Sequence, residues 1–184
     1  MSPLDTYLQL RGKVDSLCRQ IENAHPEAIS CQAGCDSCCQ ALTLFPVEAY
    51  ALARAIALQP EAIREKLYAR GRETHEDGRC PLLEQGRCLL YDDRPIICRT
   101  HGLPILLREP EGTRVDFCPL NFVGYDSLSG SSLIDLERLN QLLAAINHDF
   151  VTRTFGPQAP TDRIAMGDAL LLPWPPPATD KASS

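Results

Sequence analysis

The residues of this chain with the most specific chemistry are its cysteines. There are nine cysteines among 184 residues, and four fall in the stretch Cys31-Gln-Ala-Gly-Cys35-Asp-Ser-Cys38-Cys39. Thiolates are soft ligands that favour zinc, copper(I) or iron–sulfur assemblies over magnesium or calcium. Zinc sites and iron–sulfur clusters each commonly take four thiolates, so eight suit two mononuclear sites, a cluster plus a mononuclear site, or one polynuclear site. We expect metal binding by Cys31, Cys35, Cys38, Cys39, Cys80, Cys88, Cys98 and Cys118.

The adjacent pair Cys38-Cys39 constrains how these ligands are shared. Neighbouring side chains point to opposite sides of an extended segment, and on a helix they diverge by about 100°. Both sulfurs on one mononuclear metal would be awkward, so we expect them to face two metal sites or two atoms of one polynuclear cluster. The first cysteine stretch is then half of an arrangement that residues 80–118 complete. Metal binding would therefore be coupled to folding.

The remaining composition narrows the setting of this site. The odd number of cysteines and the adjacent pair argue against a disulfide framework, and the first residues lack a basic, apolar signal sequence. No apolar run approaches the roughly 20 residues that span a bilayer, so we expect a cytoplasmic protein with reduced thiols and no membrane contact. The formal charge of −6 argues against nucleic acid as the main partner. The partner would be a protein or small molecule that the sequence does not specify.

One spacing inside the first stretch suggests a different chemistry. Cys31-x3-Cys35-x2-Cys38 resembles the cluster motif of radical S-adenosylmethionine enzymes, in which three thiolates hold a four-iron cluster. Ser37 stands where that motif has an aromatic residue, and the alternating strand–helix pattern of that fold is missing. We therefore do not favour this interpretation.

The second cysteine set carries a longer pattern. It reads Cys80-Pro, then Gly86-x-Cys88-x2-Tyr91-x2-Arg94-Pro95-x2-Cys98-Arg99, then Cys118-Pro119. Together with the first stretch, this resembles the cysteine-cluster proteins called the CxxCxxCC or YkgJ-type family, over about residues 31–119. The resemblance implies zinc or iron chelation through the eight cysteines, and brings a loose label of iron–sulfur oxidoreductase. Flagellin lysine methylases carry a similar cluster, which makes a modification enzyme an alternative. The chain departs from the family in having His101 after Cys98-Arg-Thr.

Several polar side chains lie close in sequence to these cysteines. Arg94 and Arg99 can donate hydrogen bonds to thiolates and offset their charge, although salt bridges to neighbouring aspartates are an equal alternative. Tyr91 can donate to a sulfur or pack in the core, and packing is favoured. With eight cysteines available, we expect His101 beside the ligands or on the surface. Cys18 is expected to be a small buried hydrophobe, and surface positions are expected for His25, His75 and His148.

The elements that must position these residues follow from hydrophobic periodicity and breakers. We predict helices over residues 4–24, 46–59, 61–73 and 132–154, the last carrying a stripe from Leu133 to Phe150. Hairpins are predicted around residues 84–87 and 109–112, and a brief helix is predicted to run through Arg99. The fold class is mainly α with small β-hairpins (α+β), a compact single domain organised around a cysteine-ligated metal centre. We assign residues 1–155 to this domain, with its cysteine core at 31–119, and residues 156–184 to a proline-rich tail.

The sequence leaves three hypotheses for the function of the chain. The first is a metal-binding protein with zinc or an iron–sulfur cluster and a redox or metal-handling role. The second is a metal-dependent enzyme that modifies proteins or peptides. The third is an interaction module with purely structural zinc, which is weakened because a chain of 184 residues does not need metal merely to fold. No nucleophile elbow, His-Glu-x-x-His or phosphate-binding glycine loop points to other catalysis.

Overall fold

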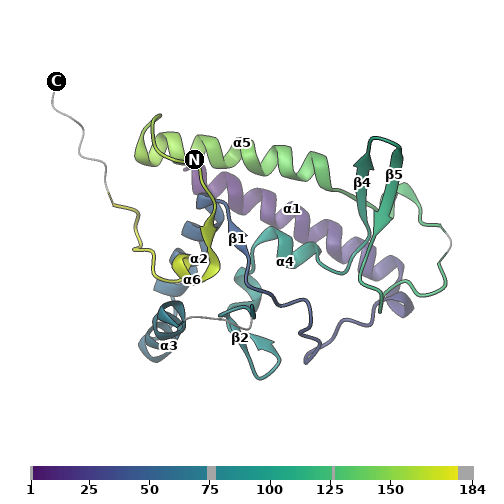
Figure 1. Cartoon of the computed structure of the whole chain (residues 1–184), viewed down its shortest axis with the longest axis horizontal. Helices are drawn as coiled ribbons and strands as arrows, with labels where there is room; N and C mark the ends of the chain where they lie inside the picture. The colour runs from purple at the N-terminus through teal and green to yellow at the C-terminus, as the bar shows by residue number, and fades with distance from the viewer. Residues whose placement is uncertain (1, 74–77, 126, 178–184) are drawn as a thin grey trace.

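The helices of the molecule form its framework, and the cysteine-bearing loops lie along one side. The computed structural model describes residues 2–73, 78–125 and 127–177. Helices α1 (Pro3–Ala24) and α5 (Leu136–Phe155) lie side by side along the long axis (Figure 1). Helix α2 (Pro46–Ala57) packs against both, and α3 (Glu61–Arg72) and α6 (Met166–Ala169) lie at one end. The prediction of a mainly α fold with small β-hairpins is confirmed.

The strands are short and serve as connections between helices. β2 (Leu83–Glu84) and β3 (Arg87–Cys88) form one hairpin, and β4 (Ile105–Glu109) and β5 (Gly112–Asp116) form the other. β6 (Ile134–Asp135) adds to β4 in parallel, and β1 (Thr43–Leu44) pairs with β7 (Ile164–Ala165). Helix α4 (Ile96–Thr100) and the 3₁₀ turns η1 (Pro26–Ala28), η2 (Tyr91–Asp93) and η3 (Gly130–Ser132) complete the elements.

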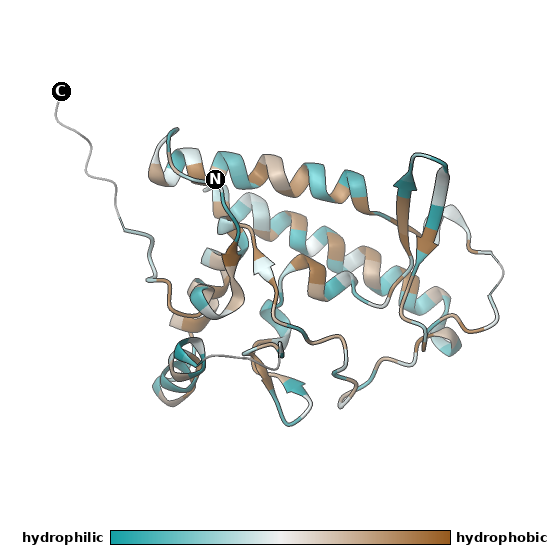
Figure 2. Ribbon diagram, viewed as in Figure 1, coloured by the Kyte–Doolittle hydropathy of each residue, from teal (hydrophilic) through white to brown (hydrophobic). Residues whose placement is uncertain are grey.

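Helix α2 lies between two hydrophobic clusters and is buried nearly all round. Val47, Tyr50 and Ala51 face the first cluster, which also contains the buried residues of α1, α5 and Phe122. Leu52 and its neighbours face the second cluster, built with Leu67, Leu82, Leu90 and α6. A helix that is apolar on every side is stable only inside a core. The colouring in Figure 2 agrees, because α2 is mostly hydrophobic whereas α3, with Leu67 as its fully buried residue, is largely hydrophilic.

The first helix begins and packs largely as its sequence indicates. Ser2 and Asp5 form a capping box, with Ser2 Oγ accepting the Asp5 amide at 3.2 Å and Pro3 in the first turn. Tyr7 is among the most buried side chains of the helix at 1% exposure. Leu8 and Leu17 are only partly buried.

Helix α5 differs from its prediction at the start. The helix begins at Leu136 rather than at residue 132, because Asp135 caps it by accepting the Arg138 amide at 3.0 Å. The residues just before the cap belong to strand β6, because Ile134 donates its amide to Pro104 O at 2.9 Å and pairs with β4. Leu142 belongs to the predicted stripe but is 47% exposed, and the buried face instead includes Asn147. Asn147 Oδ1 accepts the Val47 amide at 3.1 Å, which pins α2 to α5.

Residues after α5 return to the core. Strand β7 pairs with β1, and Met166, Ala169 and Leu170 belong to the second cluster. Trp174 packs against the first cluster, while Pro173, Pro175 and Pro177 are exposed. Within the described parts of the chain, we find no helix with the length and apolar character needed to traverse a membrane.

A buried carboxylate joins α2 to the short helix that carries Cys98. Glu48 is only 3% exposed, and its Oε1 accepts the Ile96 amide at 3.1 Å while its Oε2 accepts the Phe45 amide at 3.3 Å. Burial raises the pKa of Glu48, and the two amide donors oppose that effect. The side chain therefore sets where α4 begins relative to α2.

We predict that Glu48→Ala lowers the free energy of unfolding by about 1–3 kcal/mol, because the Ile96 and Phe45 amides lose their acceptor in the interior. Urea unfolding measures this loss, and hydrogen exchange at α4 should accelerate. Glu65→Ala is the matched control, since Glu65 is exposed on α3 and its removal should change stability by less than about 0.5 kcal/mol. Equal effects of the two substitutions would contradict the role given to Glu48.

Candidate metal centre

The first cysteine stretch folds as two successive turns rather than as a helix. The Cys35 amide donates to Gln32 O at 3.0 Å, and the Cys39 amide donates to Asp36 O at 2.9 Å. Gly34 has a φ of +94°, a left-handed conformation that favours glycine. The turns leave Cys31 and Cys38 exposed and Cys35 and Cys39 half-buried. The stretch is therefore a loop with two turns, with no helix between residues 31 and 39.

The second cysteine set lies on ordered elements next to this loop. Cys88 ends strand β3, Cys98 lies in α4, and Cys118 follows β5. The β2–β3 turn has positive φ at both Gln85 and Gly86, as a two-residue hairpin requires. A Cβ on Gly86 would lie 3.1 Å from Gly34 Cα, and the Gly34 amide donates to Gly86 O at 3.2 Å. The hairpin tip therefore lies directly against the first cysteine loop.

Backbone hydrogen bonds join the two cysteine sets just beyond this point. The Cys80 amide donates to Cys39 O at 3.0 Å, the Ala41 amide donates to Gly78 O at 2.7 Å, and Gln40 and Arg79 form an isolated antiparallel bridge. These contacts place Cys39 beside Cys80, although the two are far apart in sequence.

The thiols fall into two groups according to which sulfurs act electrostatically on one another. Cys35 is influenced by Cys31, Cys38 and Cys118, and we call these four the outer group. Cys98 is influenced by Cys80, Cys88 and Cys39, and we call these four the inner group. Cys80 in turn is influenced by Cys88 and Cys39. Cys38 acts on Cys35, and Cys39 acts on Cys80 and Cys98, so we assign the two halves of the pair to different groups, although the strongest thiol influence on Cys38 is Cys39 itself. That the pair faces two metal sites stays a prediction.

The donor atoms of both groups are of the type that zinc and iron bind. Every member is a thiol, the soft ligand that both metals accept. Within residues 2–73, 78–125 and 127–177, no three His, Cys, Asp or Glu side chains lie close enough together to hold one ion. The groups are therefore sets of neighbouring thiols, and their convergence on metal stays a prediction. When bound there, the metal would supply Lewis acidity or, as iron, redox chemistry.

Burial is the main influence on these thiols. Burial, with a smaller contribution from neighbouring cysteines, raises the pKa of Cys80 to about 11 and that of Cys98 to about 12. Burial also raises the pKa of Cys35, Cys38, Cys39 and Cys88. Thiols must lose their protons to bind metal, so loading either group would release protons.

Arg94 is the basic residue that the structure places beside the inner group. Its positive charge lowers the pKa of Cys39, Cys88 and Cys98, against the larger effect of burial. Its Nε donates to Tyr91 O at 2.9 Å, and its guanidinium lies 3.5 Å from the centre of the Tyr91 ring. Tyr91 is 59% exposed, so the favoured expectation of core packing for this residue is wrong. Its ring instead stacks on Arg94, a cation–π contact.

The side chain of Arg99 contacts α1 and the turn before α4 rather than a thiol of either group. Arg99 Nη1 is paired with Asp15 Oδ1 of α1 at 2.5 Å, its Nε donates to Arg94 O at 2.6 Å, and its Nη2 donates to Asp92 O. The guanidinium therefore fastens α4 to α1. Its ion-pair partner is Asp15 of α1 rather than an aspartate next to it in sequence. His101 is exposed at the end of α4.

The other expected positions are mixed. Cys18 is buried as predicted, and its sulfur donates to Arg99 O at 3.6 Å. His148 is exposed as expected, and His75 lies outside the described residues. His25 is half-buried rather than at the surface, because its Nε2 hydrogen-bonds Ser132 Oγ at 2.8 Å and its ring packs edge-on against Phe122 and Tyr125.

Asn121 is a residue of the site that the sequence did not single out. Its amide is 1% exposed, and its Oδ1 accepts the Ser30 amide at 2.9 Å while its Nδ2 donates to Gly102 O at 2.8 Å. Nδ2 also lies 3.4 Å from Cys31 Sγ, within hydrogen-bonding distance of sulfur. Asn121 therefore ties the outer thiol Cys31 to the segment that carries Cys118. The available signal was a polar residue between Leu120 and Phe122, two positions after Cys118-Pro119.

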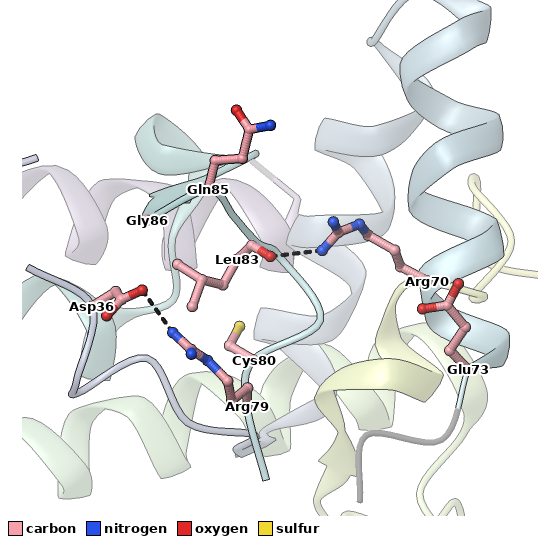
Figure 3. Close-up of a pocket in the computed structure, with 8 residues that line it drawn as sticks. All are labelled: Asp36, Arg70, Glu73, Arg79, Cys80, Leu83, Gln85 and Gly86. Atoms are coloured by element: carbon pink, nitrogen blue, oxygen red, sulfur yellow. Dashed lines mark hydrogen bonds and ion pairs between the residues drawn. The ribbon is translucent and has the colours of Figure 1, made fainter. Parts of the chain in front are cut away.

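A polar pocket of about 380 Å³ lies beside Cys80 (Figure 3). An ion pair between Arg79 Nη2 and Asp36 Oδ2, 2.6 Å apart, connects the first loop to the residue before Cys80. Arg70 Nη1 donates to Leu83 O at 2.7 Å on the other side. The inner thiol Cys80 is part of the pocket lining, and the remaining lining residues are Glu73, Gln85 and Gly86.

Comparison with known families identifies the cysteine-rich part of the chain. Residues 30–119 match the family model CxxCxxCC, whose description is "Putative zinc- or iron-chelating domain". The range spans all eight candidate ligands and leaves out Cys18, so the resemblance seen in the sequence is confirmed. No curated protein and no solved structure matches the chain.

We predict that Gly102→Ala lowers both the free energy of unfolding and the amount of metal that the outer group retains. Gly102 has a φ of +88°, and a Cβ there would lie 3.1 Å from Asn121 Nδ2, 3.4 Å from Cys31 Sγ and 3.6 Å from Cys118 Cβ. The left-handed backbone alone costs an alanine about 1–2 kcal/mol, and the buried Asn121 amide cannot move without losing its partners. Urea unfolding and metal content of the purified protein measure the two effects.

Gly12→Ala is the control for this substitution, because Gly12 lies in α1 with nothing within 4 Å of its added Cβ. Alanine there should stabilise the helix by about 0.5–1 kcal/mol and leave metal content unchanged. Wild-type stability and metal content in Gly102→Ala would contradict the packing described around Asn121.

We predict a pH-dependent stability contribution from Cys18 in reduced, metal-free protein. Burial raises the pKa of Cys18 from 9.0 to about 11. The folded state then keeps the thiol proton that the unfolded state loses, so stability falls as pH rises through this window. Urea unfolding should show the stability difference between wild type and Cys18→Ala shrinking from about pH 9 to pH 11. A difference that stays constant or grows with pH would contradict the burial of a protonated thiol.

Proposed function

We propose that this chain, whose residues 30–119 belong to the CxxCxxCC family, binds zinc or iron through eight cysteines and handles that metal as its function. The observation that carries the proposal is the backbone contact between the two cysteine sets, with the Cys80 amide donating to Cys39 O at 3.0 Å and the Gly34 amide donating to Gly86 O at 3.2 Å. We assign the eight thiols to two groups of four, each drawn from both sets. Four thiolates are the usual number for a zinc site or an iron–sulfur cluster. The structural-zinc alternative is less favoured, because two hydrophobic clusters give the chain a core of its own.

The setting of this function follows from the thiols and the charge. All nine cysteines are free in the structure, which suits a reducing compartment, and we propose the cytoplasm. The net charge of −6 makes nucleic acid an unfavourable partner. The expected partner is a protein or small molecule that donates zinc or iron to the chain or accepts it.

A second candidate function is a metal-dependent enzyme that modifies proteins or peptides. The observation that favours it is the polar pocket beside Cys80, where a substrate group could approach an inner metal. Catalysis at such a metal needs an open coordination position. A loaded protein in which both metals have four sulfur ligands would therefore exclude this function in favour of the first.

The proposed function predicts that the protein retains metal after anaerobic purification. Elemental analysis should find about two zinc or mononuclear iron atoms per chain, or iron with inorganic sulfide and a brown colour if a cluster forms. Cys88→Ser should lose metal, because it removes one thiolate of the inner group. Cys18→Ser is the matched control and should keep the full metal content, since Cys18 lies outside both groups.

Two results would overturn the proposed function. The first is metal-free protein whose eight cysteines are nevertheless intact and reduced. The second is equal metal loss in the Cys88→Ser and Cys18→Ser variants.

A further inference from the structure

Three of the inner thiols, Cys80, Cys88 and Cys98, lie on backbone that is anchored to the hydrophobic core, whereas Cys39 belongs to the first cysteine loop. Cys80 and Cys88 contact the second cluster, and Cys88 and Cys98 lie within β3 and α4. The hairpin is held by the Leu83 amide donating to Cys80 O at 3.0 Å and the Leu89 amide donating to Leu82 O at 2.9 Å. Glu48 fixes the start of α4 from the interior. Three of the four inner sulfurs are thus carried by backbone that hydrogen bonds and core contacts hold.

Three of the outer thiols lie on backbone of a different kind. Cys31, Cys35 and Cys38 occupy the turns between η1 and β1, which are held by turn hydrogen bonds and by single contacts with Gly86, Asn121 and Arg79. Such segments open locally at a low free energy. Cys31 and Cys38 are exposed, whereas all four inner thiols are half-buried, although surface pockets reach Cys80 and Cys88. A competing chelator or acceptor therefore reaches the outer group more easily.

Charge also distinguishes the groups. Four thiolates around one divalent ion leave a net charge of about −2, which a nearby cation stabilises. Arg94 supplies a positive charge beside the inner group, held in place by Tyr91 and by Cys98 O at 3.5 Å. Asp36 acts unfavourably on Cys35 of the outer group and on Cys39 of the inner group, and its carboxylate is paired with Arg79 at 2.6 Å. Arg94 is therefore the charge that favours a loaded inner group.

Two backbone hydrogen bonds join the first cysteine loop to the segment of the inner hairpin. The Gly34 amide donates to Gly86 O, and the Cys80 amide donates to O of Cys39, the last cysteine of the loop. Binding of metal by Cys39 in the inner group would also fix the adjacent Cys38 of the outer group. Removing an outer ligand leaves these contacts in place, whereas an empty inner group leaves Cys39, and with it Cys38, without that metal bond.

We infer that the two groups have different tasks: the inner group holds a resident metal, and the outer group takes up and releases an exchangeable zinc or iron ion only when the inner group is filled. This inference rests on the proposed function and adds a division of labour to it. No electron transfer is required, because metal exchange replaces one set of thiolate bonds with the ligands of an acceptor and returns protons to the released thiols.

Chelator challenge of the loaded wild-type protein tests the inference directly. The protein is exposed anaerobically to EDTA, and thiols freed over time are alkylated with N-ethylmaleimide and located by peptide mass spectrometry. The outer cysteines should be labelled with loss of the first metal, and the inner cysteines should follow at least about tenfold more slowly, the factor given by about 1.4 kcal/mol. Inner cysteines labelled first, or all eight labelled together, would overturn the inference while leaving metal binding intact.

A pair of variants provides an independent test by metal content. Cys31→Ser should lose the outer metal and retain the inner one, whereas Cys98→Ser should lose both, with Cys18→Ser unchanged as control. Retention of the outer metal in Cys98→Ser would contradict the dependence, and if that variant fails to fold, the wild-type labelling order still decides. A protein whose thiols are labelled at the same rates with and without EDTA would instead refute the proposed function itself.

Discussion

The hydrogen bonds between residues 39–41 and 78–80 are the contact on which the metal centre depends. They bring the last cysteine of the first loop against the first cysteine of the second set, with helices α2 and α3 between them in sequence. Closing so long a segment is unfavourable in entropy, and two backbone hydrogen bonds alone would not hold it. The burial of α2 between two hydrophobic clusters, with Leu67 of α3 in the second, keeps the ends of this segment together. The site is therefore a product of the hydrophobic core, and metal would add to a fold that already exists.

Around that contact, single side chains place the remaining thiols. Glu48 positions α4 and with it Cys98, while Arg99 fastens the same helix to α1 through Asp15. Asn121 joins Ser30, Gly102 and Cys31, which brings the segment after β5 to the outer group. The two thiol groups therefore differ in support as well as in exposure. One rests on helix, hairpin and core, and the other on turns that a buried amide holds at one edge.

The sequence predicts the elements well where one physical signal dominates. Apolar periodicity defines α1, α2 and α3, and glycine at the turns defines both hairpins. The division of Cys38 and Cys39 between two metal sites stays a prediction from their adjacency. The sequence pattern fails where a tertiary partner decides. Asp135 begins α5 late because Ile134 pairs with β4, and Tyr91 lies on Arg94 instead of in the core. His25 is drawn inward by Ser132 and two aromatic rings, and Asn121 serves three partners that are distant in sequence. Such long-range polar contacts have no local period, so pattern alone does not find them.

We expect sulfur alone to bind the metal, from eight thiolates in two neighbouring groups of four and, if an iron–sulfur cluster forms, from inorganic sulfide as well. X-ray absorption spectroscopy at the edge of the retained metal decides this, because the first coordination shell reports ligand type and number. The expected shell contains about four sulfur atoms, at about 2.3 Å if the metal is zinc. A shell containing nitrogen or oxygen at about 2.0–2.1 Å, the distance of histidine or carboxylate ligands, would contradict it.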